Sequence, residues 1–135
     1  MIIAYFHQKT LMILAVTVNF TVPGIPISYK RVTHGNHPHN PAVYREYRKA
    51  VALVARSVMK DIECTLKPVG VTVWVYHPVK AASKQSGDID NHLKSILDAL
   101  NGIAFKDDGQ VVKATIYKIK DKLNPRVEIN VTDEL

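Results

Sequence analysis

The chain has 135 residues, with 18 Lys and Arg against 12 Asp and Glu and a formal net charge of +6. This length is typical of one domain with a substantial core, and the basic balance favours a polyanionic partner such as nucleic acid slightly over a merely solubilising surface. The single cysteine, Cys64, excludes an internal disulfide and a zinc site built from several thiolates, and it fits a reducing, cytoplasmic environment.

We expect the chain to consist of an N-terminal extension of unclear role, residues 1–11, and a single domain, residues 12–135. The apolar stretch "LMILAVTV" is far too short to cross a bilayer and precedes no small-residue cleavage site, so we expect no membrane partner. Its β-branched residues instead predict a buried strand over residues 13–22, ended by Pro23, Gly24 and Pro26.

A loop rich in His, Pro and Asn follows at residues 29–41. His34, His37 and His39 have the chemistry of metal ligands, but the loop contains several breakers and no cysteine, which favours a solvated loop near DNA. Lys30 and Arg31 at its start are candidates for phosphate contacts, and a plain solvated role is equally compatible with both.

Two helices and three further strands complete the expected fold. Apolar residues at spacings of three and four predict helices over residues 42–62 and 91–100. Alternation predicts a strand over residues 71–76, and "VVKATIYKI" with "RVEINVT" reads as an antiparallel hairpin. Between the first of these strands and the second helix lies a small, polar loop in which Lys80 and Lys84 are further candidates for DNA contacts. The order β-α-β-α-β-β predicts an α+β domain, a mixed sheet of about four strands with both helices on one face.

The acidic residues gather in "SGDIDNHLKSILDALNGIAFKDDGQVV", residues 86–112, at Asp88, Asp90, Asp98, Asp107 and Asp108. Each position has an ordinary explanation. Asp90 is a reasonable helix N-cap, Lys94 lies one turn from both Asp90 and Asp98, and "DDGQ" is a favourable turn. Jointly they are harder to dismiss, because adjacent carboxylates repel unless a cation or a proton is shared between them. Mg²⁺ is commonly held by one or two carboxylates plus substrate phosphate.

This stretch resembles the RusA family of Holliday junction resolvases, endonucleases that cut four-way DNA junctions. The family pattern, a D-x-D-N-x-x-K stretch opening a helix that ends in D-A-L and a D-D/E-x-Q-V turn, is present as "DIDNHLK", "DAL" and "DDGQV". The resemblance implies that Asp88, Asp90 and Asp108 are the catalytic and metal-binding carboxylates and that Lys94 is the functional lysine. It also implies dependence on Mg²⁺, with Mn²⁺ as a possible substitute, and a homodimer that makes paired symmetric cuts in DNA recombination and repair.

The implied reaction is metal-assisted phosphodiester hydrolysis, in which Mg²⁺ activates the water nucleophile and offsets charge in the transition state. Lys94 would stabilise the reacting phosphate or the leaving oxygen, while Asp98 and Asp107 are expected to have supporting roles. A dimer is also favoured by "VTVWVY", which carries large side chains on both faces of one strand. Two alternatives stay open, a nuclease of this fold acting on other branched DNA, as in phage replication or packaging, and a non-catalytic DNA-binding module.

Overall fold

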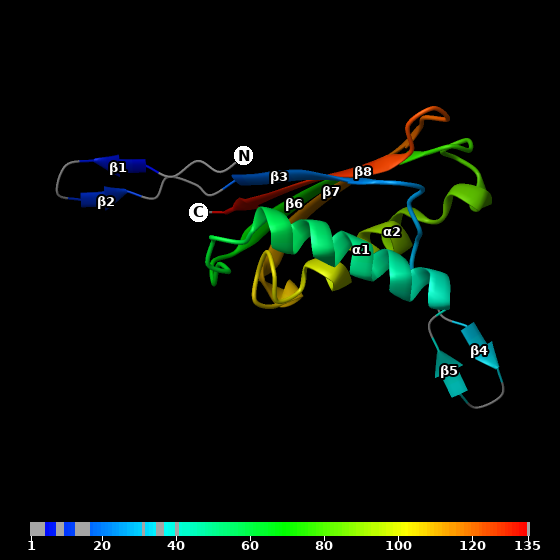
Figure 1. Cartoon of the computed structure of the whole chain (residues 1–135), viewed down its shortest axis with the longest axis horizontal. Coiled ribbons are helices and arrows are strands. Elements are labelled where there is room, and N and C mark those ends of the chain that lie inside the picture. Colours follow the sequence, from blue (N-terminus) through cyan, green and yellow to red (C-terminus); the bar gives the residue numbers. More distant parts are fainter. Residues whose placement is uncertain are drawn as a thin grey trace.

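A computed structural model describes residues 5–7, 10–12, 17–30, 32–34, 37–39 and 41–134 of the chain (Figure 1). Its centre is a four-stranded mixed sheet in the order β3-β8-β6-β7, and both α-helices lie on one face of it. This confirms the expected α+β class. The elements of this core are β3 (Thr17–Pro23), α1 (Ala42–Val58), β6 (Val69–His77), α2 (Ile89–Leu100), β7 (Val111–Lys120) and β8 (Arg126–Asp133).

Two small hairpins lie outside this sheet. β1 (Tyr5–His7) pairs with β2 (Thr10–Met12) in the segment expected to be an extension, and β4 (Val32–His34) pairs with β5 (His37–His39) within the histidine-rich loop. Two short 3₁₀ turns, η1 (Lys84–Ser86) and η2 (Asp108–Gln110), flank α2 in the chain. Residues 13–16, where the first long strand was expected to begin, lie outside the described residues, as do the side chains of His34, His37 and His39.

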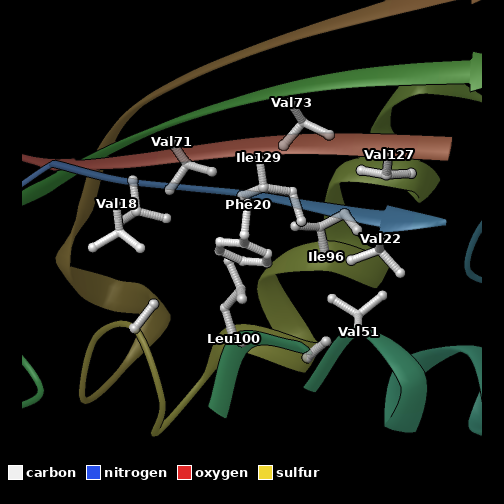
Figure 2. Packing of buried hydrophobic residues seen from close by; sticks show 14 of the residues in the cluster. Val18, Phe20, Val22, Val51, Val71, Val73, Ile96, Leu100, Val127 and Ile129 are labelled. Carbon is white, nitrogen blue, oxygen red and sulfur yellow. The ribbon is translucent and has the colours of Figure 1, made fainter. Parts of the chain in front are cut away.

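The core forms between the sheet and the two helices because every second strand residue is apolar. Val18 and Phe20 on β3 and Ile129 on β8 are buried against the helices. Figure 2 shows these strand side chains reaching toward Leu100 of α2 and Val51 of α1. Helix α1 ends at Val58, four residues earlier than expected, because the chain turns there and the amide of Ile62 bonds the carbonyl of Met59.

The expected hairpin between the last two strands is wrong. β8 lies between β3 and β6, pairing antiparallel with both, while β7, among the strands that the structure describes, pairs with β6 alone and runs parallel to it. Burial explains the difference. β8 buries Val127, Ile129 and Val131, which suits a central strand, whereas none of the side chains of β7 is fully buried. A parallel pair needs a crossover connection, and α2 provides it.

The two ends of the sheet have different neighbours, and this positions the acidic residues. At one end Pro23 and Tyr76 pair with Arg126, and both helices begin there; we call this the helix-start end (Figure 1). At the other end Val69 pairs with Val111 and with Asp133, and both helices stop there; we call this the helix-stop end. The two helices therefore run in the same general direction beneath the sheet.

Candidate active site

Asp88 and Asp90 both lie at the N-terminus of α2, at the helix-start end. Asp88, rather than Asp90, is the N-cap residue, with extended backbone (φ −79°, ψ 145°), and its side chain makes no capping hydrogen bond. Asp90 lies in the first turn, where its Oδ1 accepts from the amide of Asn91 at 3.0 Å. Both carboxylates are exposed. The positive end of the helix macrodipole partly offsets their repulsion, and their remaining oxygens are open to a ligand.

The backbone just before Asp88 is held from three sides. Gly87 has φ 85°, and a Cβ there would lie 2.6 Å from Ser28 Oγ and 2.7 Å from His92 Nε2, so glycine is required. Lys118 of β7 donates from Nζ to the Gly87 carbonyl at 2.6 Å and to Ser86 Oγ at 3.0 Å. His92 Nε2 makes a hydrogen bond to the Ser86 carbonyl. These contacts fix the position from which Asp88 projects.

His92 has a structural place in this arrangement. Its side chain is 2% exposed, and its ring meets that of His77 with centroids 6.5 Å apart. Burial lowers the pKa of His92, and the charges of His77 and Lys118 act in the same direction. The ring is therefore neutral near pH 7 and, with Nε2 protonated, donates to the Ser86 carbonyl.

Lys94 lies one helical turn beyond Asp90 and faces α1. Its Nζ is 3.5 Å from Asp98 Oδ2 and 5.0 Å from the centroid of the Tyr29 ring. Asp98 also accepts a hydrogen bond of 3.1 Å from the Tyr44 hydroxyl, and burial followed by the Asp98 charge raises the pKa of Tyr44 to about 12. Of the two carboxylates one helical turn from Lys94, Asp98 forms the expected ion pair with it. Asp98 therefore orients the lysine side chain.

The second acidic segment is a tight turn at the helix-stop end. Asp107 caps it: its Oδ2 accepts from the Gly109 amide at 2.9 Å, and its own amide donates to Gln110 Oε1 at 2.9 Å. Gln110 in turn donates from Nε2 to the carbonyls of Thr65 and Lys67, both at 2.9 Å. Asp107 is thereby committed to the turn. Asp108 is exposed, and within the described part of the chain its carboxylate has no hydrogen bond or ion pair.

The two acidic segments lie at opposite ends of α2. The loop after this helix stays at its C-terminus, where the Gly102 amide donates to the Phe105 carbonyl at 2.8 Å, and Phe105 bridges to Thr65. A helix of 12 residues is about 18 Å long, whereas ligands of one Mg²⁺ lie about 2 Å from it. Among the residues that the structure describes, no three His, Cys, Asp or Glu side chains converge on a metal position. One chain thus does not bring Asp108 to Asp88 and Asp90.

The family model described as "Endodeoxyribonuclease RusA" matches residues 23–132, which include both acidic segments and four of the six main elements in full. The chain belongs to the RusA family. It is also 31% identical over 138 aligned positions to the "Uncharacterized protein YqaN" of Bacillus subtilis (strain 168), and the alignment covers 86% of this chain and 96% of that protein. Membership confirms the family resemblance seen in the sequence. The exposed carboxylates therefore belong to a chain of a nuclease family.

A cavity with basic side chains in its wall lies beside Gly87, the residue before Asp88. Lys30 and Lys84 both line this cavity of about 290 Å³, with Tyr44 in its wall. Lys80 is exposed in the loop that leads into η1, and Arg31 lies outside the described residues. The structure thus brings two of the four expected DNA-binding side chains together, next to Asp88. Among the described helices, none is long and apolar enough to cross a membrane.

The sequence did not predict two features of the region around the acidic pair. In the sequence Lys118 is one of several lysines of the expected strand "VVKATIYKI", and only the structure shows that its side chain reaches the Gly87 carbonyl. Arg48 and Arg56 of α1 line a second hollow of about 230 Å³ together with Asp98. The basic residues on the polar face of α1 could have indicated the second feature. The sequence alone did not show that this face lies beside Asp98 of α2.

Proposed function

We propose that this chain is a divalent-metal-dependent endonuclease that cuts four-way DNA junctions as a homodimer, in DNA recombination and repair. One observation carries the proposal: in a RusA-family chain, two exposed and largely uncommitted carboxylates, Asp88 and Asp90, stand together beside a basic hollow. A non-catalytic DNA-binding module would gain nothing from that pair, because carboxylates repel the DNA backbone.

The donor set fits a hard divalent cation. Mg²⁺ takes oxygen ligands and is commonly held by one or two carboxylates together with substrate phosphate, and Asp88 and Asp90 match that description. Mn²⁺ would be accepted by the same oxygens. We assign Asp108 as the third carboxylate, supplied to the pair from a second copy of the chain. When bound, the cation supplies Lewis acidity for hydrolysis of the phosphodiester bond.

The protein's own groups bind and orient the DNA. Lys94, aimed by Asp98 and Tyr29, places a point charge one helical turn from the acidic pair, where a phosphate under attack gathers negative charge. Lys30 and Lys84, on the wall of the neighbouring hollow, together with Arg31 and Lys80, are assigned to phosphates of the arms. Such contacts position the junction without reading its sequence.

The test is a cleavage assay on labelled four-way junction, flap and linear duplex DNA, each with Mg²⁺, with Mn²⁺ and with EDTA. We expect paired cuts in the junction with either metal and none with EDTA. Faster cleavage of the flap than of the junction would make flap DNA the preferred substrate in place of the four-way junction. Binding without cleavage under every condition would refute the enzymatic assignment.

A further inference from the structure

The cavity of about 290 Å³ beside Gly87 lies at the helix-start end, where the chain leads into the acidic pair. Its wall is largely apolar: Pro26 and Ile27 follow β3, and Pro41 and Val43 lie at the start of α1. The volume is at the small end of the range for ligand sites in proteins, which suits one planar ring system better than a larger cofactor. The cavity therefore has the size and the lining of a site for a small, mainly apolar group.

Phosphate binding alone does not account for this lining. Lys30 and Lys84 line the same cavity, and both side chains are exposed. Ammonium groups bind phosphate at an open surface, whereas apolar walls contribute nothing to holding a strongly hydrated anion. An apolar interior beside two exposed lysines fits a group that carries both kinds of surface. In a DNA substrate that group is a nucleotide, because its base has an apolar face for stacking and its phosphate is charged.

We infer that this cavity receives one unstacked nucleobase of the DNA, from the nucleotide next to the phosphate held at Asp88 and Asp90. The inference rests on the proposed function for the identity of the substrate, and on the structure for the cavity. Tyr44 and His77 add aromatic rings to its wall. Enzymes that act on an extruded base hold it in a close-fitting pocket among aromatic and apolar side chains, and the lining of this cavity is of that kind.

Two polar groups in the wall are free to bond the edge of the base. The Ser28 hydroxyl and the Gln85 side chain make no hydrogen bond within the described part of the chain. Ser86, in contrast, is committed, because its hydroxyl is shared between the carbonyls of Ala81 and Ser83 at 2.9 and 2.8 Å. A hydroxyl and a primary amide both donate and accept, so Ser28 and Gln85 have partners on every base. They can contribute to a choice among bases as well as to affinity.

A site for an unstacked base favours branched over continuous DNA. In an uninterrupted duplex each base is paired and stacked on both sides, and extruding it costs free energy. At a branch point the stacking is interrupted, so a base is released at a lower cost. Because the cavity lies beside Gly87, insertion of a base there brings the backbone of the same nucleotide to Asp88. Recognition of the branch and the position of the cut are thereby linked.

The insertion is tested by binding, with Asp90→Asn protein in Mg²⁺ so that the DNA stays intact. Four-way junctions are made in matched pairs, in which one base pair near the branch point loses either one base or its partner. Both members of a pair lack the same base pairing. At one position, the junction that keeps the base for the cavity should bind about tenfold more tightly than the junction that lacks it. A ratio near one at every position overturns the inference.

Filling the cavity provides the matched control. Val43 is 62% exposed, so Val43→Trp should leave the fold intact and occupy the cavity, and the tenfold ratio should fall to near one. Leu53→Trp introduces the same side chain at a position of α1 that is 69% exposed and does not line the cavity, and it should keep the ratio. Thermal unfolding compares the two folds. A tenfold ratio that persists in folded Val43→Trp protein overturns the inference.

A cross-link tests the contact without any substitution in the cavity. With 5-iodouracil at the position that shows the tenfold ratio, irradiation should join the DNA to the tryptic peptides that carry Ser28 or Tyr44. Cross-links confined to other peptides overturn the inference. The proposed function fails separately: if the wild type cleaves no DNA, the nuclease assignment falls, while the binding ratio and the cross-link still decide whether the cavity holds a base.

Discussion

Lys118 of the edge strand donates a hydrogen bond of 2.6 Å to the backbone carbonyl of Gly87, the residue immediately before Asp88. This bond connects the edge strand β7 directly to the backbone at the start of α2. The same ammonium reaches Ser86 Oγ at 3.0 Å and helps to lower the pKa of the neighbouring His77. Lys118 can in this way control where Asp88 points.

Replacing Lys118 with Met should therefore reduce both stability and cleavage. Loss of two hydrogen bonds from a charged donor should lower the free energy of unfolding by about 1–3 kcal/mol. Single-turnover cleavage should fall as well, because Asp88 is no longer held. Urea unfolding and a junction assay measure the two effects. Lys113→Met, an exposed change on the same strand, is the control, and equal losses in both variants would contradict the positioning role.

His77 should make stability depend on pH. Burial, and then the charge of Lys118, lowers its pKa from 6.5, so the folded chain keeps the ring neutral while the unfolded chain takes up a proton. The free energy of unfolding should hold above pH 6.5 and decrease as the pH falls below it. His77→Asn keeps an acceptor for the Val79 amide, which bonds Nδ1 at 3.3 Å, and should weaken this dependence. Urea titrations at pH 5.0 and 7.5 compare the slopes, and unchanged slopes would refute the assignment.

The sequence predicted well what local periodicity controls. Apolar spacing located both helices, and alternation located β6 and the burial of β8. Strand order was a different matter, because "VVKATIYKI" and "RVEINVT" are adjacent in the chain and six residues of turn-forming character invite a hairpin. The decision depends on non-local burial: β8 is the more apolar strand on its inner face and takes the centre.

For the site, the sequence identified the acidic residues but not their separation. Asp107 and Asp108 differ by one position, yet only the contacts show that Asp107 is committed to capping while Asp108 is exposed. The distance from Asp88 to Asp108 depends on the path of the loop after α2, which Phe105 pins at the helix-stop end. Spacing along a chain carries no information about such a return.

The three carboxylates should prove essential to cleavage but not to folding. Asp88→Asn, Asp90→Asn and Asp108→Asn should each abolish cleavage while junction binding is retained, because removing one of several repelling charges seldom weakens a fold or its hold on DNA. Electrophoretic mobility shift, thermal unfolding and single-turnover cleavage measure the three properties. Asp107→Asn is the neighbouring control. A dead Asp107→Asn beside an active Asp108→Asn would reverse our choice within the turn.

Two tyrosines of α1 should respond oppositely to loss of the hydroxyl. The Tyr47 hydroxyl is buried without a hydrogen-bond partner among the described residues, and burial raises its pKa. Tyr47→Phe should be neutral or stabilise by up to about 1 kcal/mol, since it removes an unsatisfied polar group. Tyr44→Phe loses the 3.1 Å bond to Asp98 and should cost about 1–2 kcal/mol. Equal destabilisation of both variants in urea would contradict this account.

Substitution of Lys94 distinguishes a catalytic role of this lysine from a merely structural one. Its contact with Asp98 is half exposed on the lysine side, and such pairs contribute only about 0.2–1 kcal/mol, so Lys94→Met should leave stability nearly unchanged. If the ammonium stabilises the reacting phosphate, single-turnover cleavage should fall about 100-fold, as for loss of one charge-stabilising donor. Junction affinity should drop only about two- to threefold, because one phosphate contact among several is lost. Asp98→Asn removes the salt bridge but keeps the ammonium, and Lys49→Met removes an exposed lysine of α1 as the control for net charge. Asp98→Asn should therefore cleave far faster than Lys94→Met, and a Lys94→Met enzyme with normal single-turnover cleavage would assign the lysine to the salt bridge alone.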